Sequence, residues 1–238
     1  MLEDELICPS KSEWNFPLVV VSKKTDASGK PKWRICIDFR KLNEVSIGDT
    51  FPLPNTQDIL DRVGKARYFT ALDCASGFHQ IAIKKEDRCK TAFSTPSGHF
   101  EYLRMPFGLK AAPSTFQRMM NSVLRDLIGD RCFVYMDDIL ILGETLAEHH
   151  EKLRNVFEQF RTYNLIIQPD KCQFLRPELS YLGHVIANEG VKPDPRKIEA
   201  VVQFPVPKKE KDVKAFLGLT GYYRKFIQNY SSIAKPLY

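Results

Sequence analysis

The most restrictive feature of this sequence is a pair of adjacent acidic residues enclosed by two strongly apolar segments. Asp137 and Asp138 separate residues 132–135 from residues 139–142, and both segments have the composition of buried strands. Successive side chains on an extended strand point to opposite faces, so only a tight turn can present both carboxylates to one site. Such a turn is either an exposed hairpin loop or, because a divalent cation lowers the cost of burying carboxylates, a metal site.

A third acidic residue lies in a similar setting. Asp73 ends the apolar segment 68–72 and is followed by four small residues, 74–77. If these strands are neighbours in one sheet, the three carboxylates form a site of hard oxygen ligands that suits two Mg²⁺ ions about 4 Å apart. That arrangement is typical of in-line phosphoryl transfer, in which one ion activates the attacking hydroxyl and the other stabilises the leaving pyrophosphate.

Composition excludes several classes of protein. The chain has 238 residues, of which 43% are hydrophobic and 27% charged, and these values exclude a disordered chain, a fibre and a disulfide-stapled miniprotein. No apolar run approaches the roughly 20 residues of a membrane-spanning helix, and the acidic N-terminus does not resemble a signal peptide. The six cysteines form no C-x-x-C pair, so we expect free thiols, no zinc site and a soluble intracellular protein.

The positive charge is concentrated at one end of the chain. Lys and Arg number 35 and Asp and Glu 29, for a net charge of +6. Residues 192–238 contain ten basic and four acidic side chains and therefore account for the whole excess. This segment predicts either a binding surface for a polyanion, nucleic acid foremost, or a solvated helix face, and charge alone favours neither.

Short apolar segments and turn signals predict an α+β fold of mixed sheets and helix clusters. Strands are expected at residues 18–23, 33–38, 68–72, 132–135, 139–142, 165–167, 172–175 and 181–186, the first two forming a hairpin with lysines at its tip. Helices are expected at residues 56–62, 113–127, 196–203 and 210–227, and after Thr145, whereas 78–84 fits either a helix or a strand.

Two of these helices have the pattern of a capping box, in which a hydroxyl side chain and a residue three positions later satisfy the first free N–H groups. The pairs are Ser114 with Gln117, and Thr145 with Glu148. The second helix is expected to bury a stripe that includes His150 between apolar residues, namely Leu146, Leu153, Phe157 and Phe160. Residues 192–195 are rich in proline and predict a subdomain boundary.

Several segments together resemble the reverse transcriptases of gypsy-class LTR retrotransposons. The central ones are LDCASGF (72–78), MPFGLKAAP (105–113) and YMDD (135–138), which occur in the family's order. The similarity extends over nearly the whole chain, through KWRICIDFRKLN (32–43), QPDKC (168–172), YLGH (181–184) and FLGLTGYYR (216–224). The chain is therefore identified as resembling a nucleotidyltransferase, an RNA-directed DNA polymerase.

The resemblance implies a right-hand polymerase whose palm has a ferredoxin-like antiparallel sheet. Fingers are expected at 1–50 and 86–112, the palm at 51–85 and 113–190, and a truncated thumb at 191–238. Asp73, Asp137 and Asp138, with the backbone carbonyl of Cys74, would bind two Mg²⁺ ions, with Mn²⁺ as a substitute. Lys171 would be the general acid that protonates pyrophosphate.

The resemblance also implies binding roles. Arg34 and Lys24 (or Lys23) would grip the triphosphate, because developing negative charge is stabilised by fixed cations. Phe78 would exclude a ribose 2′-hydroxyl, and Phe107 with Gly108 would floor the dNTP pocket. The residues expected beside primer or template are Tyr135, Met136, Leu182, Gly183, His184, Gly218 and Tyr222.

The expected partners are an RNA or DNA template–primer, dNTPs and the RNase H and integrase regions of a parent Pol polyprotein, without a membrane. The expected location is the cytoplasm or retroelement particles, with the nucleus left open. Two alternatives remain. One is an RNA-dependent RNA polymerase, against which the bulky Phe78 argues, and the other is a non-catalytic or domesticated nucleic-acid-binding fragment.

Overall fold

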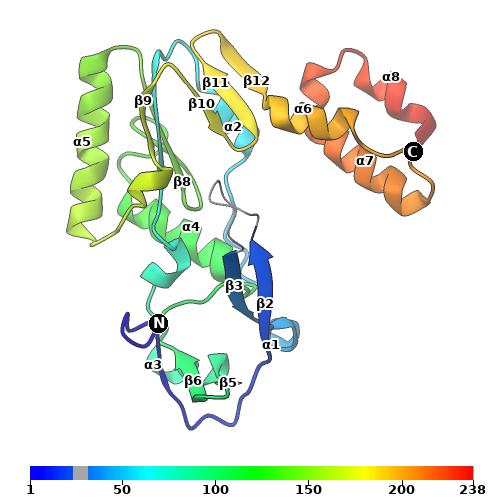
Figure 1. The fold of residues 1–238 in the computed structure, drawn as a ribbon. Coiled ribbons are helices and arrows are strands. Elements are labelled where there is room, and N and C mark those ends of the chain that lie inside the picture. The colour runs from blue at the N-terminus through cyan, green and yellow to red at the C-terminus, as the bar shows by residue number, and fades with distance from the viewer. Residues whose placement is uncertain (24–31, 238) are drawn as a thin grey trace. The chain divides into compact units, whose positions relative to one another are not determined.

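The computed structural model describes residues 1–23 and 32–237, and in these ranges the chain divides into two compact units (Figure 1). Unit 1 comprises residues 1–54, 72–139 and 153–172, and unit 2 comprises 55–71, 140–152 and 173–238. Lys24 lies outside the described residues, and Arg34 is described through its backbone. None of the described helices is long and apolar enough to cross a membrane.

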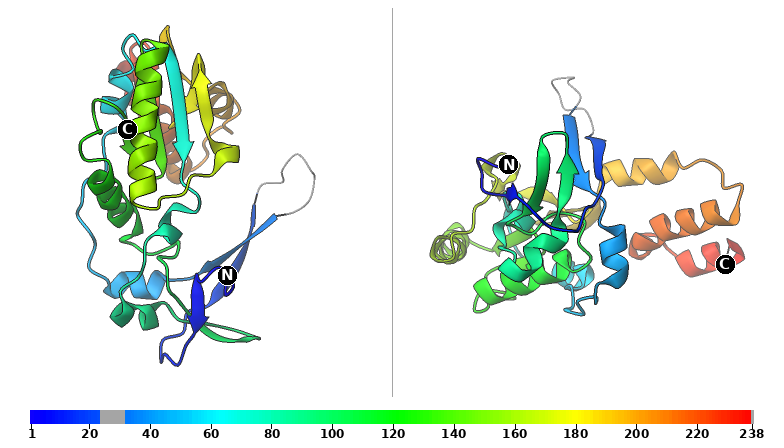
Figure 2. Two further views of the ribbon diagram at one scale, coloured as in Figure 1. Left: turned by 90° about the vertical axis from the view of Figure 1, so that its left-hand side faces the viewer. Right: turned by 90° about the horizontal axis from the view of Figure 1, so that it is seen from below.

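Unit 1 contains two small antiparallel sheets that contribute residues to one aromatic-rich core. Strands β1 (Ile7–Pro9), β6 (Gly98–Tyr102) and β5 (Phe93–Thr95) form a sheet in that order, and β2 (Leu18–Lys23) pairs with β3 (Lys32–Ile37). Strands β2 and β3 are antiparallel and lie side by side in Figure 2, which confirms the pairing expected of the hairpin. The core consists of Ile7, Phe16, Ile37, Phe39, Leu42, Phe93 and Tyr102.

The remaining short elements of unit 1 connect this core to the acidic segments. They are α1 (Arg40–Val45), the 3₁₀ turn η1 (Gly77–Gln80), α3 (Lys85–Arg88), η2 (Cys89–Thr91), α4 (Ala112–Val123) and η3 (Pro169–Lys171). Helix α4 lies against η1 and against β7 (Phe133–Tyr135).

A four-stranded sheet carries two of the acidic residues at strand ends, and Asp137 lies in the turn between two of its strands. Its order is β7, β8 (Asp138–Gly143), β4 (Tyr68–Asp73) and β9 (Gln173–Arg176), and β9 is antiparallel to β4. Asp73 is the last residue of β4, and Asp138 is the first residue of β8. Residues 139–141 of β8 are completely buried, as the apolar run predicts.

Unit 2 contains a β-meander followed by a cluster of helices. Strands β10 (Glu178–Tyr181), β11 (His184–Ala187) and β12 (Gly190–Pro193) form an antiparallel sheet. The helices that follow are α6 (Pro195–Val202), α7 (Glu210–Tyr222) and α8 (Tyr230–Ala234), with the 3₁₀ turns η4 (Arg224–Phe226) and η5 (Lys235–Leu237). Helix α2 (Thr56–Asp61), also in unit 2, precedes the meander in the sequence. Helices α7 and α8 lie side by side in Figures 1 and 2.

Several expectations about elements are wrong. The strand expected at residues 165–167 is an isolated bridge at Ile167. Residues 181–186 do not form one strand, because a turn at Leu182 and Gly183 divides them between β10 and β11. Helix α4 ends at Val123 rather than near 127, and α7 ends at Tyr222 rather than at 227. Residues 78–84 form neither a regular strand nor an α-helix, since η1 ends at Gln80 and extended chain follows.

The first capping box is also wrong. Helix α4 begins at Ala112 after Ala111, which makes no side-chain cap, and the Ser114 hydroxyl bonds to the carbonyl of Asp49 at 3.4 Å. The second is half correct. The Thr145 hydroxyl accepts from the backbone N–H of Glu148 at 3.3 Å, but the Glu148 carboxylate accepts from Glu144 N–H at 2.9 Å rather than from Thr145.

The buried stripe of α5 (Leu146–Thr162) differs from the expected one by one position. His149 is completely buried and His150 is exposed, and Leu146 is 43% exposed. The close approach of the preceding strand explains this register. A Cβ on Gly143 would lie 2.6 Å from the Cβ of His149, so only glycine allows the two backbones to meet there.

Candidate active site

The turn that carries Asp137 and Asp138 is held by a buried glutamine. Met136 adopts a left-handed conformation with φ 53°, which most residues avoid. Its N–H donates to Oε1 of Gln117 at 2.7 Å, and Nε2 of Gln117 donates to the Val134 carbonyl at 3.3 Å. Gln117 is completely buried on α4, so these two hydrogen bonds are shielded from water and hold the turn in place.

Sequence analysis missed this role, since it assigned Gln117 to a helix cap. The available signal was the position of Gln117 on the apolar face of α4. That face includes Phe116 and Met120, which are also completely buried. A glutamine buried among such residues needs partners for its amide, and the neighbouring turn supplies them.

The structure brings Asp73 and the 137–138 turn together. The N–H of Cys74, the residue after Asp73, donates to the carbonyl of Asp137 at 3.3 Å. Gly77 allows a further close approach, because a Cβ there would lie 3.0 Å from the Phe116 ring and 3.4 Å from Cβ of Asp137. Asp73 therefore lies beside the turn of Asp137 and Asp138, and all three residues belong to unit 1.

The electrostatics of the site show an excess of negative charge. Burial, followed by the charges of Asp137 and Asp73, raises the pKa of Asp138 to about 6, and Lys171 partly opposes this shift. Burial also raises the pKa of the Cys74 thiol to about 12, with the same aspartates contributing. The thiol is therefore protonated at neutral pH, and the charge at the site resides on the carboxylates.

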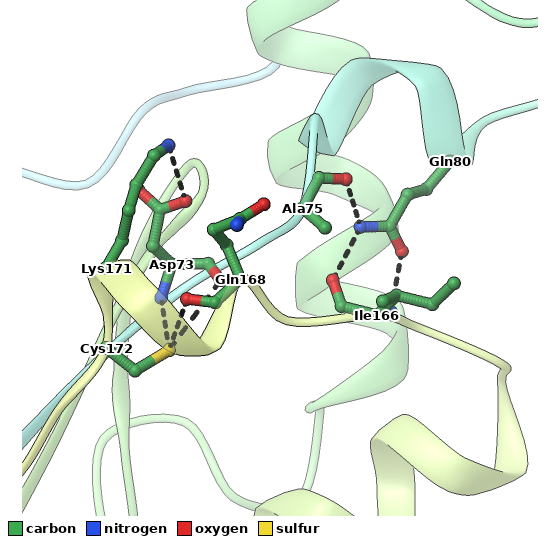
Figure 3. Close-up of polar contacts among 7 residues, drawn as sticks. All are labelled: Asp73, Ala75, Gln80, Ile166, Gln168, Lys171 and Cys172. Atoms are coloured by element: carbon green, nitrogen blue, oxygen red, sulfur yellow. Dashed lines mark hydrogen bonds and ion pairs between the residues drawn. The ribbon is translucent and has the colours of Figure 1, made fainter.

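Lys171 lies directly over Asp73. Its Nζ is 3.0 Å from Oδ1 of Asp73, and the lysine side chain is 62% exposed against 21% for the aspartate (Figure 3). The adjacent Cys172 supports the backbone of Asp73, because its Sγ accepts from the Asp73 N–H at 3.5 Å and lies 3.2 Å from the Gln168 carbonyl. The general-acid candidate and a metal-ligand candidate are thus in direct contact.

The donor set fits a hard divalent cation. Within residues 1–23 and 32–237, no three acidic, imidazole or thiol groups converge as a finished metal site, and the Asp73 carboxylate is paired with Lys171. The oxygens of Asp73, Asp137 and Asp138 are ligands of the kind that Mg²⁺ prefers. The pKa of Asp138 is raised first by burial and then by the neighbouring carboxylates, and a cation would stabilise its charged form against both effects. The residues present therefore fit the expected ions.

Two residues predicted for the nucleotide pocket are in contact. The rings of Phe78 and Phe107 are 5.1 Å apart, and Phe78 also meets Phe116 at 5.7 Å. Phe107 is 41% exposed, so the pair presents an aromatic surface rather than a filled core. Gly108 follows with φ 95°, in the region that favours glycine.

The loop at Gly108 is held by a side chain that sequence analysis did not select. Nδ2 of Asn43 donates to the Gly108 carbonyl at 2.8 Å, and Oδ1 of Asn43 accepts from the Lys110 N–H at 2.8 Å. Arg34 lies in β3 opposite Val21, where it belongs to the same unit as this loop. Tyr135 and Met136, expected beside the primer, are half-buried around the acidic turn.

The residues expected to form the primer grip lie in unit 2, in the turn between β10 and β11. Leu182 and Gly183 both have left-handed backbones, with φ 47° and 77°. The Tyr222 hydroxyl donates to the Leu182 carbonyl at 2.7 Å, and the Tyr223 hydroxyl donates to the Gly183 carbonyl at 3.0 Å. Aromatic residues at the end of α7 thus hold the turn.

His184 is buried beneath this turn. Its ring lies 5.3 Å from Tyr222, 5.5 Å from Tyr223 and 5.7 Å from Phe226, and its Nδ1 bonds to the Leu182 carbonyl at 3.1 Å. Gly218 lies one turn before Tyr222 on α7. A Cβ at Gly218 would meet nothing within 4 Å, so packing within the described chain does not require glycine there.

Comparison with known proteins agrees with the geometry. The profile of the reverse transcriptase (RNA-dependent DNA polymerase) family matches residues 21–186. Among similar proteins of Drosophila melanogaster, the Retrovirus-related Pol polyprotein from transposon 297 is 54% identical over 100% of this chain and 22% of its own length. The corresponding polyprotein from transposon gypsy is 43% identical, over 100% of this chain and 23% of its own length.

Solved structures give the same result for the fold. The foamy viral protease–reverse transcriptase dRH in complex with double-stranded DNA superposes with a TM-score of 0.90 and 28% identity, covering 100% of this chain and 41% of that one. The foamy viral enzyme in complex with an RNA/DNA hybrid gives a TM-score of 0.84 and 27% identity, with 100% and 31% covered. These similarities confirm the α+β right-hand polymerase fold.

The present chain spans about a fifth of the length of the curated polyproteins that it matches. Within that span, the family profile covers the segments that carry the three acidic residues, the aromatic pair and the turn at Leu182 and Gly183. By this match and by its similarity to the Pol polyproteins over its full length, the chain belongs to the reverse transcriptase (RNA-dependent DNA polymerase) family.

Proposed function

We propose that this chain is the polymerase region of a retroelement Pol polyprotein and adds dNTPs to a primer 3′ end on an RNA or DNA template. The observation that carries the proposal is the hydrogen bond from Cys74 N–H to the Asp137 carbonyl, which joins the strand of Asp73 to the acidic turn. This bond sets the end of the Asp73 strand beside the acidic turn, and the primer terminus and the dNTP would meet there.

Members of this family use divalent metal ions. We assign Asp73, Asp137 and Asp138, with the Cys74 carbonyl, as the ligands of two Mg²⁺ ions, with Mn²⁺ as a substitute. When bound, the ions would activate the primer 3′-hydroxyl and neutralise charge on the triphosphate. Burial first, and the neighbouring carboxylates second, raise the pKa of the half-buried Asp138 to about 6, and bound cations would favour its charged form.

Lys171 is the proton donor in this proposal. Its Nζ lies 3.0 Å from Oδ1 of Asp73, and its side chain is 62% exposed, so the lysine can turn toward a bound phosphate. As the bond between the α- and β-phosphates breaks, pyrophosphate gains negative charge, and a proton from Lys171 Nζ would neutralise part of it. Arg34 on β3, together with Lys24 or Lys23, would hold the triphosphate.

The aromatic pair would select the sugar and support the nucleotide. The Phe78 ring is packed from two sides, by Phe107 and Phe116, so it resists displacement by a ribose 2′-hydroxyl. Phe107 and Gly108 would form the floor of the pocket, and the two bonds from Asn43 would keep that loop in place.

Template and primer would be bound mostly through their backbones. Tyr135 and Met136 would lie beside the primer end, while Leu182, Gly183 and His184 would form the primer grip. Gly218 and Tyr222 would follow the minor groove, and the free space beside Gly218 supports close approach of a strand. The basic segment 192–238 would contact phosphates without reading sequence, so affinity is expected to fall with salt.

The proposal includes the division into fingers, palm and thumb given above. It also includes a parent polyprotein with RNase H and integrase regions, since the similar proteins are Pol polyproteins. The expected location, in the cytoplasm or in retroelement particles with the nucleus as the alternative, stays a prediction.

Primer extension tests the proposal directly. The purified protein is given poly(rA)/oligo(dT), dTTP and Mg²⁺, and is compared with Asp137→Asn and with the control Asp130→Asn, which changes an exposed aspartate. We expect the parent and the control to extend the primer, and Asp137→Asn to lose at least 100-fold in rate. Equal extension by Asp137→Asn would refute the metal assignment.

The same assay distinguishes the alternatives. Incorporation of ribonucleotides in preference to deoxynucleotides by the parent would identify an RNA polymerase. Tight template–primer binding without any extension would identify a non-catalytic nucleic-acid-binding protein.

A further inference from the structure

The side-chain amide of Gln80 joins two loops of the candidate site. Its Nε2 donates to the carbonyl of Ala75 at 2.9 Å and to the carbonyl of Ile166 at 2.8 Å, and its Oε1 accepts from the N–H of Ile166 at 2.8 Å (Figure 3). Both amide hydrogens and the oxygen are thus used, and every partner is a backbone group. No reaction step assigned above involves Gln80.

The first of these loops carries metal-ligand candidates. Ala75 is two residues after Asp73 and follows Cys74, whose carbonyl is a further candidate ligand. The second loop runs from Ile166 to η3, which ends at Lys171. Gln80 itself ends η1, two residues after Phe78, so its amide connects three functional segments.

Backbone hydrogen bonds continue the connection. Ala75 N–H donates to the Ile166 carbonyl at 2.9 Å, and Gln168 N–H donates to the Asp73 carbonyl at 2.8 Å. Ile167 forms an isolated bridge with Cys74 between these two bonds. This short ladder consists of these two backbone hydrogen bonds, and the Gln80 amide adds two further bonds at Ile166, where the ladder begins.

The ladder leads directly to the reacting groups. Lys171 N–H donates to the Gln168 carbonyl at 3.0 Å, and Lys171 Nζ reaches Asp73 at 3.0 Å. Movement of Ile166 away from Ala75 would therefore change the separation between Lys171 and Asp73. Reaction rates are sensitive to displacements of about 1 Å in such groups.

We propose that Gln80 is a positioning residue that sets the loop of Asp73 and Cys74 against the loop of Lys171. This inference rests on the proposed polymerase function. Glutamine matches the contacts, because a carboxylate would face two carbonyl oxygens. An aliphatic side chain would remove the partners of the Ala75 carbonyl and the Ile166 N–H, and would leave the Ile166 carbonyl with Ala75 N–H as its remaining donor. Gln80 is half-buried, so water can replace part of its bonding and the main effect of removing it is on geometry.

The experiment uses Gln80→Met, which keeps the length and volume of the side chain, and Gln80→Glu, which keeps only the acceptor. The matched control is Gln57→Met, because the Gln57 amide bonds locally to Asp61 on the exposed surface of α2. The first measurement is hydrogen exchange in the metal-free protein, followed on peptides covering 73–80 and 164–170.

We expect about tenfold faster exchange in both peptides for Gln80→Met and Gln80→Glu, and no change for Gln57→Met. One lost hydrogen bond is worth about that factor, since about 1.4 kcal/mol is tenfold. Exchange in the core peptides of β8 is expected to match the parent in all variants. Unchanged exchange in both loop peptides would refute the inference without any assay of activity.

The second measurement is steady-state extension as a function of dTTP and Mg²⁺. For both Gln80 variants we expect a 10- to 100-fold lower kcat and a higher Mg²⁺ concentration at half-maximal rate, with template–primer Kd within twofold of the parent. A purely structural role would instead lower the amount of active protein at unchanged Mg²⁺ dependence, and that result would overturn the proposal. If the parent itself extends no primer, the proposed function fails, and the exchange data alone decide the role of Gln80.

Discussion

Replacing Gln117 by methionine tests whether one buried amide sets the geometry of the acidic turn. Methionine keeps the volume and helix propensity of glutamine but lacks its hydrogen-bonding groups. The change removes the acceptor of Met136 N–H at 2.7 Å and the donor to the Val134 carbonyl at 3.3 Å. It also removes the bond from Nε2 to Asn121 Oδ1 at 2.9 Å, which Asn121 can exchange for water because it is only half-buried.

The magnitude follows from these contacts. Leaving the Met136 N–H without its acceptor costs about 1–3 kcal/mol, and the longer bond to Val134 contributes about 0.5–1.5 kcal/mol. Met136 also holds a left-handed conformation, which costs roughly 1–2 kcal/mol and which the chain would tend to leave once the amide is absent. We therefore expect Gln117→Met to lower the free energy of unfolding by about 2–4 kcal/mol.

Urea unfolding and primer extension measure the two consequences. The control is Gln203→Met, at the C-cap of α6, where the side-chain amide donates to Glu199 on the exposed surface at 2.9 Å. We expect the control to lie within about 0.5 kcal/mol of the parent, as is usual for exposed positions. Under conditions where Gln117→Met is fully folded, its kcat should fall at least tenfold. An unfolding midpoint equal to that of the parent, or full activity, would refute the reasoning.

Two further predictions concern unit 2. Gly218→Ala should raise the free energy of unfolding by about 0.5–1 kcal/mol, because alanine is the better helix former and its Cβ meets no atom within 4 Å. The same change should weaken template–primer binding severalfold. A Kd equal to that of the parent would contradict close approach of a strand at Gly218. Burial first, and then the positive charges of His150 and Lys152, lowers the pKa of His149, whose two ring nitrogens have no hydrogen-bond partner in the described chain. Protonation therefore favours the unfolded state, and stability should fall as pH drops through about 6.5, the ordinary histidine value. Thermal melting between pH 8 and 5 should show a smaller loss for His149→Leu than for the parent and for His150→Leu, and equal losses in all three would contradict this account.

Local patterns in the sequence predicted the elements of the site well. The hairpin of β2 and β3, the strand that ends at Asp73 and the strands around Asp137 and Asp138 all follow from short apolar runs bounded by turn residues. The pleat of a strand explains why both aspartates need a turn, and the positive φ of Met136 is consistent with that turn.

Local patterns failed where the same residues fit two different positions in the fold. A hydroxyl followed by a glutamine suggested a helix cap at Ser114, but the helix begins before it and Gln117 turns into the core. His149 and His150 are equally polar neighbours, and only the close backbone of Gly143 decides which one is buried. In both cases packing against another element overrides the local preference.

The sequence by itself determined the candidates for chemistry. The carboxylates stand out as local properties, because they lie at a strand end and a turn between apolar runs, and the resemblance to a known family added Lys171 and Phe78. Only the tertiary structure decided how they are held. The side-chain amide of Gln80 bonds to backbone groups 5 and 86 residues away in the sequence. For Gln117 the separations are 17 and 19 residues, and for Asn43 they are 65 and 67. A glutamine or asparagine side chain can cap a helix, lie on the surface or hold a buried backbone group. Its hydrogen-bond partners depend on which distant segments fold against it, and a local sequence pattern carries no information about them.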